Sequence, residues 1–272
     1  MVDSRVSISK FLNTEGFQSM NIILLEKNEV RRDRLLLDDH RAKHIVKVLK
    51  SQVGDVLRIG MLDGDVGEGR VESFQPKFPF SVELSVTLTA SPVPAPAIDL
   101  VLALPRPIML KRILSQVTSL GVGRIYIINA NRVEKSFWKA GILDPEEYMP
   151  HLIQGLEQAV DTRLPDIQIR QRFRPFIEDE FPQIAREYSH LLLAHPDGKG
   201  SLAKSMEDTA GRVLYAVGPE GGWVDFEVEQ FCRAGMQIFS MGERILKVDT
   251  ATIAIHSRIM QQFERNGCAE QG

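Results

Sequence analysis

A proline-rich segment, TASPVPAPAID at residues 89–99, most constrains how this chain can fold. Three prolines lie within five residues there, and proline disfavours both helix and the interior of a sheet. The sequence patterns on the two sides of this segment also differ. We therefore predict a linker at residues 91–97 between a first domain at 20–90 and a second at 98–272, with residues 1–19 as a disordered extension.

The first domain shows the alternation of apolar and polar residues that is typical of half-buried strands. The stretches GDVLRIGMLDGDVGEGRVESF and FSVELSVTLTA carry this alternation between Gly and Asp turns. The stretch DDHRAKHIVKVLK instead predicts one short helix. A small antiparallel sheet or barrel with one helix follows from this pattern.

Basic residues concentrate near the start of the first domain. Residues 27–50 contain eight Lys or Arg against four Asp or Glu, although the whole chain has a net charge of −3. Such a cluster either contacts RNA phosphates or is only a solvated face. The candidates for phosphate contact are Arg31, Arg32, Arg34, Lys43, His44, Lys47 and Lys50.

The second domain alternates short apolar runs with longer helical patterns. IDLVLAL, RIYIIN, HLLLAHP, RVLYAV and MQIF indicate strands that are apolar on both faces, which is typical of a parallel sheet covered by helices on each side. Ligands of such α/β sheets bind outside the carboxyl ends of the strands. Three of these ends are unusual: AHPDGKG, GPEGGW and MGERILKVDTA. Glycine there lets the backbone approach a ligand closely, so we expect a side chain at Gly221 to occupy space that the ligand needs.

Several classes of protein lack support in this sequence. GPEGG is neither a GxGxxG loop nor a Walker A loop, and no GxSxG or HExxH motif occurs. Two cysteines without paired spacing support neither a disulfide framework nor a metal site. No signal peptide and no run of about 18 apolar residues occurs, so we expect a soluble, cytoplasmic protein without membrane or metal partners.

Two C-terminal motifs carry a family resemblance. VGPEGGW, followed about twenty residues later by MGERILKVDTATIAI, resembles the last two motifs of the RsmE family of 16S rRNA uridine N3-methyltransferases, in the SPOUT superfamily. HIVKVLK and LALPRPIMLKRILSQVTSLGVGRI resemble two earlier segments of that family. The chain departs from the family pattern at Asp249, where the family usually has Glu, so another rRNA or tRNA position is an alternative target.

The resemblance implies a fold, a cofactor and partners. The expected fold is a SPOUT α/β domain with a C-terminal trefoil knot, preceded by a small PUA-like β-barrel domain that grips RNA. The expected methyl donor is S-adenosyl-L-methionine (SAM). The expected partners are 16S rRNA or the 30S subunit and a second copy of the chain in a homodimer. A noncatalytic RNA-binding assembly factor is the alternative from another class.

The resemblance also assigns roles to residues at the three strand ends. The candidates for the cofactor wall are Ala194, His195, Gly218, Glu220, Gly221, Gly222, Met241, Gly242, Ile245 and Leu246. Arg244 either stabilises charge on the uracil ring or pairs with a neighbouring carboxylate. Glu220 either takes the N3 proton or accepts N–H bonds within its loop, and Asp249 either takes it or caps the C-terminal helix.

Overall fold

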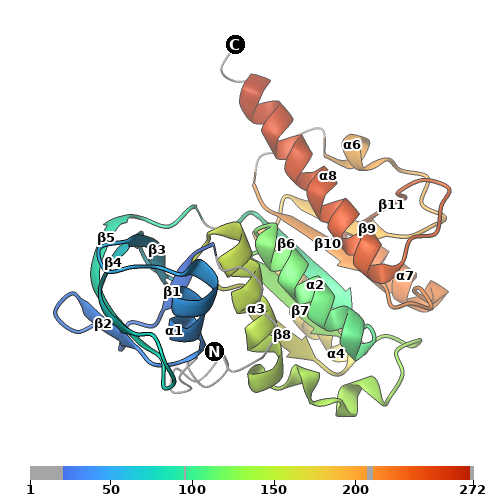
Figure 1. Ribbon diagram of the computed structural model, residues 1–272. Helices are drawn as coiled ribbons and strands as arrows, with labels where there is room; N and C mark the ends of the chain where they lie inside the picture. The colour runs from blue at the N-terminus through green and yellow to red at the C-terminus, as the bar shows by residue number, and fades with distance from the viewer. Residues whose placement is uncertain (1–20, 95, 207–210, 270–272) are drawn as a thin grey trace. The chain divides into compact units, whose positions relative to one another are not determined.

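The computed structural model describes residues 21–94, 96–206 and 211–269, in two compact units (Figure 1). The first unit contains the residues up to Pro94 together with Asp144–Leu164, and the second contains Ala95–Leu143 and the residues from Pro165 onward. Residues 144–164 follow the linker in sequence but belong to the first unit, which sequence patterns did not indicate. The extension expected at residues 1–19 lies outside the described residues.

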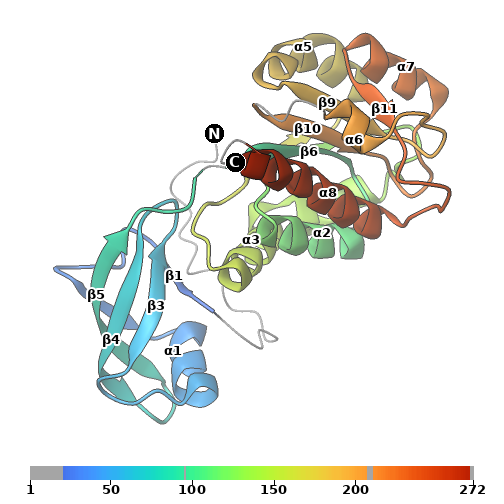
Figure 2. The same ribbon diagram turned by 90° about the horizontal axis from the view of Figure 1, so that it is seen from above.

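The first unit is a curled five-stranded sheet (Figures 1 and 2). The strand order is β1-β3-β4-β5-β2; β1 pairs with β3 in parallel, and the other pairs are antiparallel. Alternate residues of these strands point into a buried aliphatic core. The strands are β1 (Ile23–Leu25), β2 (Arg34–Leu37), β3 (Val56–Met61), β4 (Val66–Gln75) and β5 (Ser81–Ala90).

Two helical segments belong to the first unit. The expected short helix is α1 (His40–His44), whose N-terminus is capped by Asp39, and it continues as the π-helix η2 (Ile45–Leu49). The second is α3 (Pro145–Ala159), which packs its apolar face against the β1 side of the sheet. Arg32 and Asp33 both have positive φ, as the two central residues of a tight hairpin turn require.

A buried charge cluster lies between α1 and the start of the sheet. The Arg41 side chain is 3 % exposed and donates to Glu29, Asp39 and the Leu24 carbonyl oxygen. Glu157 of α3 is also buried, and burial raises its pKa to about 8, although the charge of Arg41 acts in the opposite direction. The Glu157 carboxyl is therefore mostly protonated at neutral pH in the folded protein.

Replacing Glu157 with Gln is expected to stabilise the protein at pH 8. The pKa of this carboxyl is higher in the folded than in the unfolded state, so the parent loses stability as pH rises from about 4.5 towards 8. An uncharged amide removes that loss, so the thermal midpoints of Glu157→Gln and parent should differ at pH 8 and converge near pH 5. Glu146→Gln, on the exposed side of the same helix, is the control. Equal midpoints at pH 8 would contradict the buried-carboxyl assignment.

The second unit is a six-stranded sheet in which every pairing is parallel, as the apolar runs predicted. The strand order is β11-β9-β10-β6-β7-β8. The strands are β6 (Ile98–Ala103), β7 (Arg124–Ile128), β8 (Asp166–Arg170), β9 (His190–Ala194), β10 (Val213–Val217) and β11 (Gln237–Phe239). The expected trefoil knot remains a prediction.

Helices cover both faces of this sheet (Figure 2). The helices α2 and α8 lie side by side on one face, and α5 and α7 lie on the other. The main helices are α2 (Pro107–Ser119), α7 (Asp225–Arg233) and α8 (Val248–Ala269), and α6 (Leu202–Ser205) is shorter. Two short helical segments follow β7, η3 (Phe137–Lys139) and η4 (Gly141–Leu143). Four more follow one another directly after β8: α4 (Phe173–Pro175), η5 (Phe176–Glu180), α5 (Phe181–Ile184) and η6 (Ala185–Glu187).

A buried hydrogen-bond chain fixes α8 to its neighbours. The His256 ring bonds Tyr215 of β10 through Nδ1 and the Leu120 carbonyl oxygen, at the end of α2, through Nε2, both at 3.2 Å. Burial lowers the pKa of His256 to about 4, so the ring is neutral at physiological pH. A neutral ring that donates from Nε2 leaves Nδ1 to accept the tyrosine proton, which satisfies both nitrogens.

Candidate functional site

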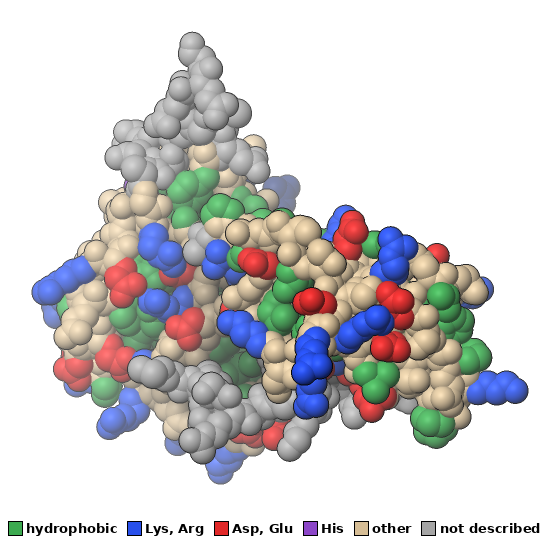
Figure 3. Space-filling view, turned by 90° about the vertical axis from the view of Figure 1, so that its left-hand side faces the viewer, with side chains coloured by type: hydrophobic (Ala, Val, Ile, Leu, Met, Phe, Trp, Pro, Cys, Tyr) green, Lys and Arg blue, Asp and Glu red, His purple; other side chains and the backbone are tan. Residues whose placement is uncertain are grey.

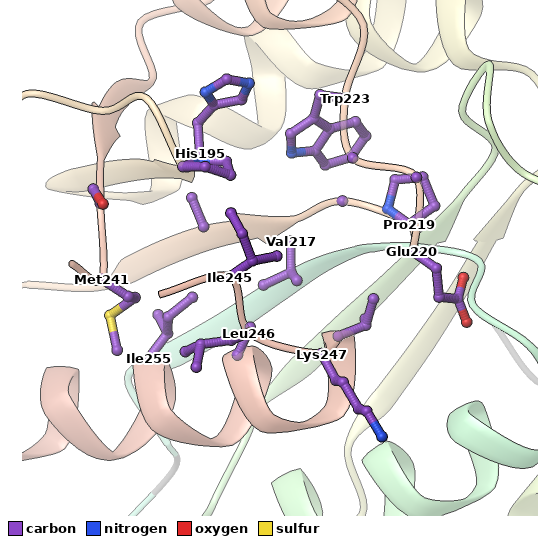
Figure 4. A pocket seen from close by; sticks show the side chains of 18 of the residues that line it. His195, Val217, Pro219, Glu220, Trp223, Met241, Ile245, Leu246, Lys247 and Ile255 are labelled. Atoms are coloured by element: carbon purple, nitrogen blue, oxygen red, sulfur yellow. The ribbon is translucent and has the colours of Figure 1, made fainter. Parts of the chain in front are cut away.

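A pocket of about 660 Å³ opens in the second unit where β9, β10 and β11 end (Figure 4). It also receives the loop after β6 and the first turns of α8. All ten residues predicted for the cofactor wall line this pocket, and Arg244 lines it as well. The structure therefore brings together the three strand ends that sequence analysis singled out. Whether these residues bind SAM stays a prediction.

Other lining residues were missed from the sequence. Arg106 follows β6, so the rule that ligands bind at strand ends applied to it too. Trp223 ends the glycine loop, Lys247 immediately precedes α8, and Ala251 and Ile255 belong to the first turns of α8. The remaining additions are Met109, Pro196, Val217, Pro219, Ser240 and Val248.

The backbone conformation of the glycine loop at residues 218–223 depends on three of its residues. Gly222 has φ +72°, a region that residues with a Cβ adopt only with strain. A Cβ on Gly218 would lie 3.2 Å from the buried ring of Trp223, so glycine lets this ring pack under the strand end. The Trp223 Nε1–H has no hydrogen-bond partner in the described part of the chain. The loop thus brings its backbone to the pocket wall, with the Trp223 N–H buried behind it.

Gly221 is constrained by a side chain outside the pocket, which differs from the expectation that its Cβ would meet the ligand. A Cβ there would approach the Arg132 side chain at 3.0–3.1 Å, and Arg132 is not among the pocket-lining residues. The Arg132 guanidinium also donates a hydrogen bond to the Gly221 carbonyl oxygen. Arg132 therefore supports the glycine loop from behind.

A buried carboxylate connects this loop to the loop after β7. Glu227, in the first turn of α7, is 2 % exposed. Its two oxygens accept the backbone N–H groups of Asn131 at 2.6 Å and Val224 at 3.0 Å. Two charge-assisted hydrogen bonds to backbone hold the end of the glycine loop in place.

Replacing Glu227 with Gln is expected to weaken ligand binding without touching the pocket. The amide accepts only one of the two N–H bonds and turns its own NH₂ donors towards the other, at a cost of about 1–3 kcal/mol. Calorimetry should show weaker SAM binding and a lower thermal midpoint. Glu229→Gln is the matched control, because Glu229 lies on the same helix in an exposed ion pair with Arg233. Parent-like SAM affinity in Glu227→Gln would separate this carboxylate from the site.

The structure distinguishes the two candidate carboxylates. Glu220 lines the pocket and accepts the backbone N–H of Arg106 at 3.0 Å. The alternative role considered for Glu220 was to accept an N–H of its own loop, and Arg106 lies outside that loop. Asp249 does not line the pocket. It lies in the first turn of α8 and accepts the N–H of Thr250 at 2.9 Å, which favours its helix-stabilising role.

Three cationic residues, Arg106, Arg244 and Lys247, line the pocket together with Glu220. In Figure 4, Lys247 and Glu220 both lie on the side of the pocket away from Met241. Arg244 is exposed, and in the described part of the chain it pairs with neither Glu243 nor Asp249. His195 is held locally, because its Nδ1 accepts the N–H of Asp197 at 3.2 Å. The pocket is therefore mostly apolar, with a charged edge.

The predicted RNA-contacting residues all lie in the first unit. Six of them are exposed, whereas His44 is buried and so offers little surface to RNA. Arg34 lies within 4 Å of Glu72 and Glu83, which offset its charge. On the face shown in Figure 3, Lys and Arg side chains lie among Asp and Glu side chains. The expected basic surface is therefore mixed in charge on this face.

The described residues offer neither a metal site nor a membrane span. They contain no group of three or more His, Cys, Asp or Glu side chains placed to hold a metal ion. None of their helices has the length and apolar character needed to cross a membrane.

Two family models match this chain. Residues 92–260 match the model of an RNA methyltransferase domain, and residues 37–83 match that of an RNA methyltransferase PUA domain. A ribosomal RNA small subunit methyltransferase E from Treponema pallidum is 33% identical over 239 residues, covering 86% of this chain and 88% of that protein. This chain belongs to the ribosomal RNA small subunit methyltransferase E (RsmE) family. A second member, from Borreliella burgdorferi, is 27% identical over 86% of this chain and 95% of its own length.

Solved methyltransferase structures share the fold of this chain. A ribosomal RNA small subunit methyltransferase E from Neisseria gonorrhoeae, bound to S-adenosyl methionine, superposes with a TM-score of 0.72 at 20% identity, covering 89% of this chain and 98% of that one. A putative methyltransferase from Legionella pneumophila, in complex with SAM, gives 0.73 at 19% identity over the same shares. A SPOUT α/β unit with an N-terminal PUA unit is thus the architecture of this chain.

Proposed function

We propose that this protein transfers a methyl group from SAM to N3 of a uridine in 16S rRNA. One observation carries the proposal: in a member of the RsmE family, the residues predicted for the cofactor wall line a single pocket at the carboxyl ends of the strands. Relatives described as SAM-bound share this fold. A methyltransferase needs such a pocket, whereas an assembly factor without activity does not.

The pocket fits SAM in size and chemistry. Its volume of about 660 Å³ is in the range of small-molecule sites, roughly 300–1,000 Å³. Glycines 218, 221, 222 and 242 carry no Cβ, so the adenosine and amino acid parts can approach the backbone closely there. Ile245, Leu246 and Val217 supply an apolar wall.

The charged edge of the pocket suits the uracil. Bound SAM supplies a methyl group on a sulfonium, and the nitrogen that accepts it must lose its proton. Charge then develops on the ring carbonyl oxygens next to N3. The unpaired Arg244 guanidinium stabilises this charge, and Arg106 and Lys247 keep the edge cationic.

Glu220 is the carboxylate that we assign to the proton. Of the two candidates, it alone lines the pocket, and Arg106 N–H holds one of its oxygens. The other oxygen accepts no hydrogen bond from the described residues and is available to accept the N3 proton, directly or through water. Asp249 instead stabilises the start of α8.

The decisive experiment combines methyl transfer with nucleoside analysis. Purified protein is incubated with methyl-labelled SAM and either 30S subunits or naked 16S rRNA, and the RNA is digested to nucleosides. We expect the label in N3-methyluridine. Label in another nucleoside, or only in tRNA, would show that the protein is a methyltransferase with a different substrate. Absence of label from every RNA, together with no SAM binding by calorimetry, would favour a noncatalytic assembly factor.

We also propose that the active form is a homodimer. Half-buried apolar residues of α8, including Ile253 and Met260, extend its apolar surface beyond Ile255 and Ile259, which are fully buried within the chain. A symmetric partner would cover them. Light scattering should give about twice 30.6 kDa, and Met260→Glu should lower that mass. A monomer that still methylates RNA would show that activity does not need the dimer.

A further inference from the structure

One side chain of the first unit is exposed far beyond what folding requires. Phe78 lies in the turn between β4 and β5, and it is 85 % exposed, more than any other large apolar residue among those described. Its neighbours Lys77 and Pro79 are exposed as well. A phenylalanine this exposed contributes little to the core. A single exposed apolar residue is not by itself a binding site, so the groups around Phe78 decide its role.

A second aromatic residue and a lysine from another segment lie next to Phe78. The rings of Phe78 and Phe80 pack edge to face, with centroids 6.4 Å apart and planes at 85°. The Lys47 ammonium lies 5.2 Å from the centroid of Phe80, in a cation–π contact. Lys47 belongs to the basic segment at residues 27–50, so that segment and the β4–β5 turn meet in one surface. We call Lys47, Lys77, Phe78 and Phe80 the aromatic tip.

The chemistry of the aromatic tip matches single-stranded RNA. Aromatic rings stack on unpaired bases, and neighbouring lysines neutralise the phosphates of the same nucleotides. The acidic side chains among the cations of this unit limit what charge alone can contribute, so a contact that does not depend on charge adds binding free energy. An apolar protein partner would not require the two lysines.

We propose that Phe78 stacks on an unpaired base of the RNA substrate, with Phe80 holding its ring and Lys47 and Lys77 contacting the adjacent phosphates. The proposal rests on the RNA methyltransferase function proposed above. It assigns a nonionic RNA contact to a turn that sequence analysis did not select.

Salt dependence separates stacking from charge. The parent, Phe78→Ala, Phe78→Trp and Lys47→Gln are titrated with naked 16S rRNA at several KCl concentrations. We expect Phe78→Ala to bind about 5- to 150-fold more weakly, which converts from 1–3 kcal/mol per stacked base, with an unchanged slope of log K against log salt. Lys47→Gln should reduce that slope by about 0.7. Phe78→Trp should restore binding, because it keeps a stacking face.

Leu36→Ala is the matched control, because Leu36 is 67 % exposed on β2 of the same unit and is apolar but not aromatic. It should bind RNA as the parent does, and all variants should bind SAM equally. Parent-like RNA binding by Phe78→Ala, or a defect seen only with 30S subunits and not with naked rRNA, would overturn the stacking contact. If the parent methylates 16S rRNA normally in those cases, the proposed function survives; a parent that neither binds nor methylates the rRNA overturns both.

Discussion

Gly222→Val is expected to abolish measurable SAM binding, by at least 100-fold in affinity, in a protein that still folds. Gly222 has φ +72°, where a β-branched residue is strained, so valine forces the backbone of the loop at residues 218–223 into another conformation. That backbone lines the pocket through Gly218, Gly221 and Gly222. Isothermal titration calorimetry measures the affinity, and circular dichroism checks the fold.

Gly121→Val is the matched control for backbone strain. Gly121 has φ +80° in the same unit, nothing within 4 Å of a built Cβ, and no part in the pocket lining. It should lower the thermal midpoint by an amount similar to Gly222→Val while keeping parent-like SAM affinity. If both variants lost SAM binding equally, the effect would come from general destabilisation, and the glycine loop would lose its special role.

Arg244→Met is expected to reduce the rate of methyl transfer about 10²- to 10³-fold with little change in SAM affinity. Loss of one preorganised donor at a developing negative charge typically has this effect on the catalytic rate. Methionine keeps the aliphatic length of the side chain, so the pocket wall stays filled. Single-turnover methyl transfer with 16S rRNA at saturating SAM gives the rate, and Arg244→Lys should recover part of it.

Arg233→Met is the control for loss of positive charge in the same unit. Arg233 is exposed on α7, pairs with Glu229, and does not line the pocket. Its replacement should leave the rate within about twofold, because a surface ion pair contributes little. A large fall in SAM affinity, rather than in rate, for Arg244→Met would reassign Arg244 to cofactor binding.

Sequence patterns predicted the second unit well because its elements are strongly periodic. Runs that were apolar on both faces predicted strands β6, β7, β9, β10 and β11, and the structure confirms that they are parallel. The carboxyl ends of parallel strands meet at one edge, so loops 194–200, 218–223 and 241–251 had to approach one another. The position of the pocket could therefore be predicted from the parallel topology of the sheet and from the glycines in these loops.

The features that sequence patterns missed depend on contacts between distant segments. In the sequence, Glu227 is indistinguishable from an ordinary polar residue of a helical turn. Only the fold brings its carboxylate to the backbone N–H of Asn131. Arg132 lies 89 residues before Gly221, with no local pattern linking the two. Likewise, α3 returns to the first unit because its apolar face packs on Ile22 and Leu24, which a pattern of local hydrophobicity cannot specify.

The order of the lining residues along the chain has a consequence for biosynthesis. The lining begins at Arg106 and ends at Ile255 of α8, so a growing polypeptide extended only through β11 has all six strands but lacks one wall of the pocket. A ligand stabilises a folded state only by binding it. SAM therefore cannot stabilise this unit through the pocket until the start of α8 has folded against the six strands.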